Sequence, residues 1–145
     1  MATTPLTETE IALWHAFKRA AEIVRGRIAA EITRETGLSD ADFGIVTRIV
    51  DAGSSMRQNE LAASMGWHRS RLSHQLTRMV DRRLVRRLEV DNGVEVEITD
   101  EGRTVAELAR PVHAAAVRTL LIERIPADQR VGFTELLQTL ADETK

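Results

Sequence analysis

The sequence predicts a mainly α-helical fold that carries one small β-hairpin, in the order ααααββαα. Long stretches repeat apolar residues at intervals of three and four, which is the spacing of helix faces. One pair of short alternating stretches flanks an Asn-Gly dipeptide, which is typical of a hairpin. No linker or internal repeat divides the 145 residues, a length typical of one domain. We therefore expect a single domain over residues 1–145.

The first two helices are predicted from apolar spacing and from the residues at their ends. Over residues 7–32, apolar side chains recur on one broad helical face. Gly37 is expected to end this helix, because glycine readily adopts a positive φ. Residues 38–42 resemble a hydrophobic staple and an N-cap, so a second helix should start there and end near Gly53.

Two further helices are predicted on either side of Gly66. The short one begins at Gln58 or Asn59, and Gly66 breaks it. The second runs from about residue 68 to residue 83 and has one apolar and one polar face. Its inward face is expected to hold Leu72, Leu76, Met79 and Val80.

The hairpin is predicted directly after these helices. Residues 88–90 and 94–98 alternate apolar and polar side chains, and residues 91–93 between them read Asp-Asn-Gly. The hairpin is acidic, since it holds Glu89, Asp91, Glu95 and Glu97.

Two more helices are predicted at the C-terminal end. Residues 99–101 should cap a fifth helix that reaches about Ile125 and is kinked at Pro111. Pro126 suits the first position of a sixth helix, where its missing N–H costs no hydrogen bond. Both helices carry more apolar residues than packing within one small domain would cover, which favours a partner subunit.

Composition excludes several classes of protein. Hydrophobic residues make up 43% and charged residues 29%, and no apolar run approaches the roughly 20 residues that cross a bilayer. The polar, acidic N-terminus does not resemble a secretory signal, so we expect a cytoplasmic protein without a membrane partner. The absence of cysteine excludes disulfides, thiolate metal sites and thiol chemistry.

Catalytic and metal-binding patterns are also missing from the sequence. It has neither a glycine-rich phosphate loop nor a His-Glu-x-x-His motif. Asp40 and Asp42 are better explained as acids at a helix start than as an acid–base pair. His68 and His74 point to different sides of their predicted helix. We therefore expect no enzyme activity, no cofactor and no metal.

The segment around the fourth helix indicates DNA binding. A short helix, a break at Gly66, a polar-faced helix and a hairpin together describe a winged helix-turn-helix, whose second helix enters the major groove. The chain has a net charge of -2, yet Asp81 is the single acid between residues 68 and 87. The seven arginines of this segment are Arg69, Arg71, Arg78, Arg82, Arg83, Arg86 and Arg87. Such a concentration of positive charge is typical of a surface that binds nucleic acid.

The outer face of the fourth helix holds residue types that suit DNA. Arginine binds guanine with two hydrogen bonds, glutamine does so with adenine, and arginine elsewhere pairs with phosphate. The predicted DNA-binding residues are Arg69, Ser70, Arg71, Ser73, His74, Gln75, Arg78, Arg86 and Arg87. The alternative is an arginine-rich face that is merely solvated.

Four segments of the sequence resemble those of a known family. They are Asn59 to Ala62, Ser70 to Gln75, Leu84 to Arg87 and Ile98 to Arg103. In this order and spacing they resemble the MarR family of transcriptional regulators, over nearly the whole chain. The resemblance implies a homodimer that binds palindromic double-stranded DNA through residues 38–98 and pairs through residues 7–35 and 99–143. It also implies a regulator of transcription, commonly a repressor that a small organic ligand releases from its DNA.

Two features depart from the family's pattern. The hairpin reads Asp-Asn-Gly at residues 91–93, where the family usually has an Asp-x-Arg whose arginine reaches the minor groove. Phosphates would repel this acidic hairpin, so either it stands off the DNA or Arg86 and Arg87 act from its base. Arg83 stands where a glycine commonly ends the recognition helix, which predicts a different ending.

The resemblance further implies a ligand pocket between the dimerisation helices and the DNA-binding lobe. Candidate pocket residues are Trp14, His15, Phe17, Arg48 and His113, although each is also explained as a core, surface or interface residue. The lack of cysteine excludes thiol-based peroxide sensing, so a bound organic molecule is the expected signal. The alternative function is a winged-helix module that binds protein rather than DNA, which the acidic hairpin would favour.

Overall fold

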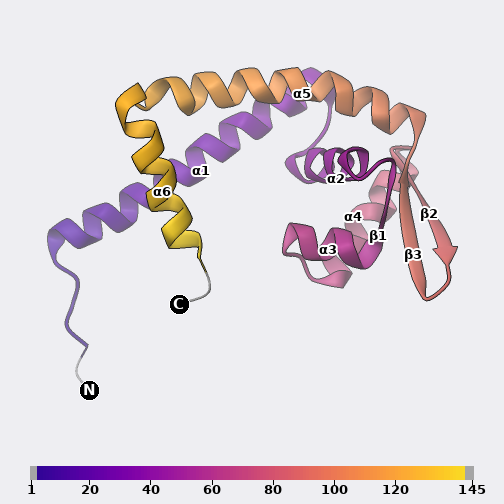
Figure 1. Ribbon diagram of the computed structural model, residues 1–145, viewed down its shortest axis with the longest axis horizontal. Coiled ribbons are helices and arrows are strands. Elements are labelled where there is room, and N and C mark those ends of the chain that lie inside the picture. The colour runs from indigo at the N-terminus through magenta and orange to yellow at the C-terminus, as the bar shows by residue number, and fades with distance from the viewer. Residues whose placement is uncertain (1–2, 143–145) are drawn as a thin grey trace. The chain divides into compact units, whose positions relative to one another are not determined.

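The computed structural model describes residues 3–142, which form six α-helices, two 3-10 helices and three β-strands (Figure 1). In chain order they are α1 Glu8–Thr36, α2 Asp40–Asp51, β1 Ser55–Arg57, α3 Gln58–Met65, α4 Arg69–Asp81, β2 Val85–Val90, β3 Gly93–Ile98, α5 Asp100–Leu120, η1 Ile122–Arg124, η2 Ala127–Gln129 and α6 Arg130–Ala141. The predicted fold class is confirmed, but the predicted order lacked β1, because three residues are too few to show an alternating pattern. None of the described helices is both long and apolar enough to cross a membrane.

The chain divides into two compact units, which we describe separately. The winged unit consists of residues 29–113, and the terminal unit consists of the residues up to 28 and from 114 onward. The boundaries fall inside α1 and α5, so both helices contribute to both units. Position 143, the predicted end of the C-terminal dimerisation segment, lies outside the described residues.

The winged unit has a closed apolar core, to which α2, α3, α4, the sheet and the parts of α1 and α5 within this unit contribute. Its fully buried side chains include Ile32, Leu38, Ile45, Val46, Ile49, Leu61, Leu72, Leu76, Met79, Val85 and Val96. Three of the four predicted inward residues of α4 are among them. Val80 is instead 37% exposed. At 100° per residue it falls on the edge of the apolar face, so its predicted burial was wrong.

Local hydrogen bonds explain where α2 begins. The Ser39 hydroxyl accepts from the backbone N–H of Asp42 at 3.0 Å, and the Asp42 carboxylate accepts from the N–H of Ser39 at 2.9 Å. This capping box satisfies two backbone donors at once, and the predicted N-cap is confirmed. Just before it, Gly37 ends α1 with φ 77°, as its residue type predicted.

The three strands form an antiparallel sheet in the order β1-β3-β2. In the hairpin Val90 pairs with Gly93, so Asp91 and Asn92 alone form the turn. Asn92 takes the left-handed conformation, with φ 65°. The predicted hairpin is confirmed, but its turn is one residue shorter than expected because Gly93 already belongs to β3.

Both ends of the recognition segment use left-handed residues. Gly66 follows α3 with φ 65°, as its residue type predicted. Arg83, just after α4, has φ 60°, so it adopts the conformation that a glycine would take without strain. The prediction of a different ending was therefore wrong, because the helix ends in the manner of a glycine-terminated helix, at a cost in backbone energy.

The junction between α5 and α6 differs from the prediction. The helix α5 ends at Leu120 and not near Ile125, and Pro126 precedes η2 instead of starting α6. Ile125 has ψ 121° and Pro126 has ψ 138°, so both are extended. A residue before proline is pushed out of the helical region, which explains why Ile125 is extended and why no helix runs through this pair.

The terminal unit begins with a second capping box. The backbone N–H of Thr7 donates to the Glu10 carboxylate at 2.7 Å, and the Thr7 hydroxyl accepts from the N–H of Glu10 at 3.2 Å. The hydrogen bond from the Thr7 backbone holds the pKa of Glu10 below its usual value. This contact fixes the start of the long helix α1.

The terminal unit has almost no core of its own. Of its described residues, Ala116 alone is buried. On α6 the apolar side chains at spacings of three and four are all exposed, namely Phe133, Leu136, Leu137 and Leu140. On α1 the exposed apolar side chains are Ile11, Leu13, Trp14, Phe17 and Ile23. The apolar faces predicted from the sequence exist, but within this chain they are not covered.

Candidate nucleic-acid interface

Within the winged unit, α3 and α4 form a helix-turn-helix. The left-handed Gly66 ends α3, and α4 begins three residues later at Arg69. His68 is the N-cap of α4, because its Nδ1 accepts from the backbone N–H of Ser70 at 3.2 Å. The apolar side of α4 packs into the core, so its opposite side is left to solvent.

The outer face of α4 carries most of the predicted DNA-binding residues. Arg69, Ser70, Arg71, His74 and Arg78 are exposed, and Ser73 is half-buried. The only acid of α4 is its last residue, Asp81. Within residues 3–142, Arg69, Arg71 and Arg78 form no salt bridge, so their charges are available to an anionic partner.

Arg71 is ordered by an aromatic neighbour that the sequence analysis did not single out. Its guanidinium carbon lies 3.8 Å from the centre of the Trp67 ring. A guanidinium stacked on an indole is attracted to the negative face of the ring and loses part of its freedom. The signal in the sequence was an aromatic residue four positions before an arginine at a helix start.

Gln75 lies elsewhere than the sequence predicted. We expected it near the edge of the outer face, but it is only 7% exposed. Its Nε2 donates to Oδ1 of Asp42 at 2.7 Å, and its Oε1 accepts from Nη2 of Arg78, also at 2.7 Å. The side chain turns inward because Asp42 of α2 offers it a buried acceptor. Contact between Gln75 and DNA stays a prediction.

Asp42 is the buried acid at the centre of these contacts. It is 1% exposed, and its Oδ2 lies 2.6 Å from Nη1 of Arg82. A second nitrogen of Arg82 donates to the carbonyl oxygen of Gly37 at 3.2 Å. The predicted helix-start role of Asp42 is confirmed by its capping box. Its contact with Arg82 had no signal in the sequence, since the two residues are 40 positions apart.

The arginines at the base of the hairpin are bound within the winged unit. Arg87 donates to the carbonyl oxygen of Ser73 and, at 3.2 Å, to the hydroxyl of Thr77, so it ties β2 to α4. Its Nε is buried and has no hydrogen-bond partner among the described residues. Arg86 forms a 2.8 Å ion pair with Glu97 of β3. Their predicted DNA contacts would have to replace or share these bonds.

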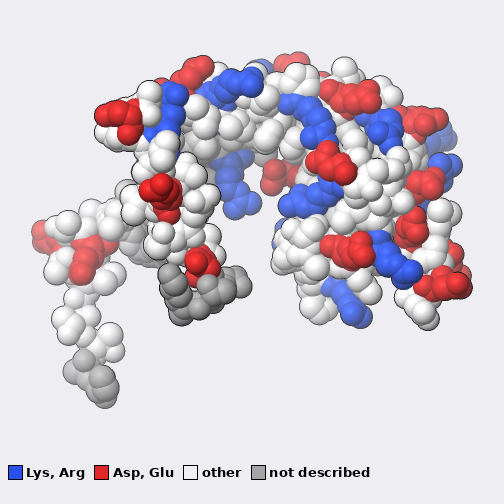
Figure 2. All heavy atoms as spheres, in the orientation of Figure 1, with Lys and Arg blue, Asp and Glu red and all other residues white. Residues whose placement is uncertain are grey.

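The hairpin itself carries negative charge. In Figure 2, acidic side chains gather over the β2–β3 hairpin, in agreement with its four acids. Arg57 of β1 is directed to the hairpin turn, where it donates to the carbonyl oxygen of Asp91 at 3.3 Å. Because phosphates repel carboxylates, the arginine-bearing helix α4 would favour an anionic partner, whereas the acidic hairpin would favour a basic one.

The candidate pocket residues of the terminal unit lie close together on α1. The rings of Trp14 and Phe17 stack with their centres 6.2 Å apart, and Nζ of Lys18 lies 5.1 Å from the centre of the Trp14 ring. His15 lies beside a shallow hollow that Arg19 also lines. These aromatic side chains are exposed, so the reading of Trp14 and Phe17 as core residues of this chain was wrong.

The other two candidates belong to the winged unit. Nη1 of Arg48 donates to the carbonyl oxygen of Gly44 at 2.9 Å, within α2. The ring of His113 packs against Phe43, with the ring centres 4.8 Å apart. Both side chains are half-buried and have partners of their own. Their role in ligand binding stays a prediction.

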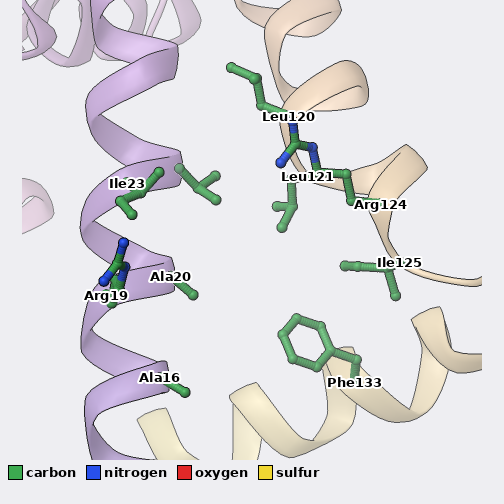
Figure 3. A pocket seen from close by; sticks show the side chains of 10 residues that line it. Ala16, Arg19, Ala20, Ile23, Leu120, Leu121, Arg124, Ile125 and Phe133 are labelled. Carbon is green, nitrogen blue, oxygen red and sulfur yellow. The ribbon is translucent and has the colours of Figure 1, made fainter.

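A larger hollow lies wholly within the terminal unit. Its volume is about 450 Å³, and Figure 3 shows side chains of α1 facing those from the end of α5 to α6 across it. Its walls are apolar, with Ile23, Leu121 and Phe133 among them, and its charged residues are Arg19 and Arg124. Among residues 3–142, by contrast, no group of three or more acids and histidines could hold a metal ion.

The helix pair α3–α4, the exposed face of α4 and the β2–β3 hairpin define a winged helix-turn-helix protein. Two crystal structures from Streptomyces coelicolor are similar to it over nearly their whole length. AbsC, a MarR family transcriptional regulator, is 26% identical, with a TM-score of 0.89 and 96% of each chain covered. Sco3205, a MarR family transcriptional regulator in complex with DNA, is 26% identical, with a TM-score of 0.88 and 97% of this chain and 90% of that chain covered. These similarities support the resemblance to MarR family transcriptional regulators that the sequence predicted.

A more distant structure has the same fold. A MarR variant from E. coli, complexed with operator DNA, is 20% identical and has a TM-score of 0.82, with 96% of this chain and 100% of that chain covered. No protein-family model and no curated protein sequence matches the chain. The likeness to MarR family regulators therefore depends on the three-dimensional similarity and on the 26% identity of the two Streptomyces proteins.

Proposed function

We propose that this chain is a transcriptional regulator that binds specific sites in double-stranded DNA. The observation that carries the proposal is the outer face of α4, where three arginines without acidic partners lie beside serine and histidine. In the proposed complex α4 enters the major groove, Arg71 contacts a guanine edge and Arg78 contacts a phosphate. The two similar Streptomyces proteins support this role, since both are MarR family transcriptional regulators and one was solved with DNA.

The regulator is proposed to act as a homodimer. The exposed apolar faces of α1 and α6 support this, because a monomer would leave them in water. One α4 helix per subunit would then meet two half-sites of a palindrome, related by the twofold axis of the dimer. Occupying a promoter in this way represses transcription, so repression in the cytoplasm is the proposed mode of action.

A small organic effector is proposed to release the DNA. The hollow of about 450 Å³ in the terminal unit supports the proposal, because its apolar walls and few charged groups suit such a molecule. Trp14 lies outside this hollow, so a bound effector that quenches Trp14 fluorescence would instead indicate the exposed face of α1. A thermal-shift screen of small organic compounds, with and without DNA, tests the proposal. If none of the compounds lowers the affinity of the protein for DNA, the result contradicts the proposal.

The main experiment measures binding of the homodimer to a fluorescent duplex from the DNA upstream of its own gene. Arg71→Ala should weaken binding about 10- to 100-fold, because one bidentate base contact contributes roughly 1–3 kcal/mol. Arg34→Ala is the matched control: it removes the same charge from an exposed arginine that pairs with Glu31 at the end of α1. Affinity of the wild type should fall steeply with salt concentration, since phosphate contacts release counterions.

Each outcome of this experiment has a clear reading. Salt-steep binding that Arg71→Ala weakens and Arg34→Ala leaves unchanged supports the regulator. Equal affinity for the upstream duplex and a random duplex, unaffected by Arg71→Ala, contradicts it. The acidic hairpin would then favour the second candidate function, a winged-helix module that binds a basic protein partner.

A further inference from the structure

Gln75 and Asp42 form a buried pair that the proposed DNA contacts do not use. Both side chains are nearly inaccessible to solvent, and they come from different helices, α4 and α2. Their hydrogen bond, 2.7 Å long, joins residues that are 33 positions apart. A buried polar pair of this kind fixes how two elements meet, because breaking it would leave polar groups unsatisfied.

The chemistry of Asp42 sets the orientation of the Gln75 amide. An ionised carboxylate only accepts hydrogen bonds, so Gln75 must turn its NH₂ group toward Asp42. Its carbonyl oxygen then points the opposite way, where it accepts from Nη2 of Arg78 at 2.7 Å. The carboxylate of Asp42 thus determines which end of the Gln75 amide donates to Asp42 and which end accepts from Arg78.

The carboxylate of Asp42 thereby acts on two arginines, Arg78 of α4 and Arg82 just after its end. It binds Arg82 directly at 2.6 Å and Arg78 through the amide of Gln75. Arg78 remains exposed, so its guanidinium is held on one side and open to a partner on the other. A side chain that is already ordered loses less conformational entropy when it binds.

We propose that Gln75, oriented by Asp42, is a positioning residue that holds Arg78 ready for a DNA phosphate and does not itself read a base. This inference rests on the proposed function. It deepens that function by assigning one of the predicted DNA-binding side chains, Gln75, to the support of another, Arg78. Gln75 suits this role because it lies one helical turn before Arg78, inside the unit.

The test is a double-mutant cycle on DNA affinity, with Gln75→Met, Arg78→Ala and the double variant. Methionine keeps the length of the side chain and suits a buried site. Gln75→Met should weaken binding to the upstream duplex roughly 3- to 10-fold, the effect of freeing one long side chain. In the Arg78→Ala background the same change should cost nothing further, because the arginine to be positioned is gone.

Two outcomes would overturn the inference. If Gln75→Met weakens binding equally in both backgrounds, Gln75 contacts DNA or only supports the fold. Thermal unfolding of the four proteins separates these two explanations. A purely structural role of Gln75 lowers the melting temperature by the same amount with and without Arg78, whereas a DNA contact weakens binding without that loss of stability. A wild-type protein that binds the upstream duplex no better than random DNA would overturn both the inference and the proposed function, whereas an additive cycle would overturn the inference alone.

A measurement on the wild-type protein covers the case in which Gln75→Met does not fold. NMR of the arginine guanidinium groups reports how fast each rotates about its Cζ–Nη bonds. Arg78 should rotate more slowly than Arg69, which makes no hydrogen bond or ion pair with the described residues. Equal rotation rates for the two arginines would show that Arg78 is not held, and would overturn the inference.

Discussion

The winged unit and the terminal unit are built from the same kinds of residues but differ in what covers their apolar faces. In the winged unit, side chains from α1 to α5 and from the sheet bury one another. In the terminal unit, helices with equally apolar faces leave them exposed, and Ala116 is the only buried residue among those described. From this difference we expect the winged unit to be stable by itself and the terminal unit to depend on the second subunit of the proposed dimer.

The largest expected effect is on the terminal unit. Leu137→Asp should raise the dissociation constant of the proposed homodimer more than 100-fold, because burying a leucine contributes about 1.5–3 kcal/mol and the dimer would contain two copies. Leu88→Asp in the hairpin is the matched control, since the two leucines are 39% and 42% exposed. Sedimentation equilibrium measures both, and equal dissociation constants would remove the proposed distinction between the units.

A core truncation tests the winged unit. Leu76→Ala should lower the free energy of unfolding by about 3 kcal/mol, because it removes buried methyl groups and leaves a cavity. Leu108→Ala makes the same change in the same unit at a residue that is 61% exposed, and it should cost less than about 0.5 kcal/mol. Urea unfolding gives both values. Similar losses would mean that the core is not as closed as its burial indicates.

The two tryptophans allow each unit to be followed separately. Trp14 belongs to the terminal unit and Trp67 to the winged unit, and the chain has no other tryptophan. In a Trp67→Phe protein, a tenfold rise in protein concentration should stabilise the unit that Trp14 reports by up to about 1.4 kcal/mol. In a Trp14→Phe protein the unfolding that Trp67 reports should not depend on concentration. Identical shifts in both proteins would indicate that the chain unfolds as one cooperative body.

The smallest effect is expected at the end of α4. Arg83→Gly should stabilise the winged unit by about 0.5–1 kcal/mol, because glycine relieves the left-handed strain but loses more entropy on folding. Arg83→Ala keeps the Cβ atom and therefore the strain, so it should bring no such gain. Thermal unfolding of both variants decides the point, and a gain with alanine would show that the strain is not the cause.

The sequence predicted what depends on periodicity and on turn chemistry. The inward positions of Leu72, Leu76 and Met79, the stop at Gly66 and the capping box at Ser39 all follow from residues within one or two helical turns of one another. The contacts of Gln75 were missed because its partner, Asp42, lies on another helix. A glutamine at the edge of an amphipathic helix can turn outward or inward, and only the position of a distant carboxylate decides which.

The separation of charge within the winged unit affects how the protein would approach DNA. Arginines on α4 and carboxylates on the β2–β3 hairpin lie on different elements, so the unit carries an electric dipole. In the field of a polyanion such a dipole experiences a torque, which turns α4 toward the DNA and the hairpin away before contact. The acids of the hairpin would thus contribute to the rate of productive encounters, although they oppose binding once the surfaces meet.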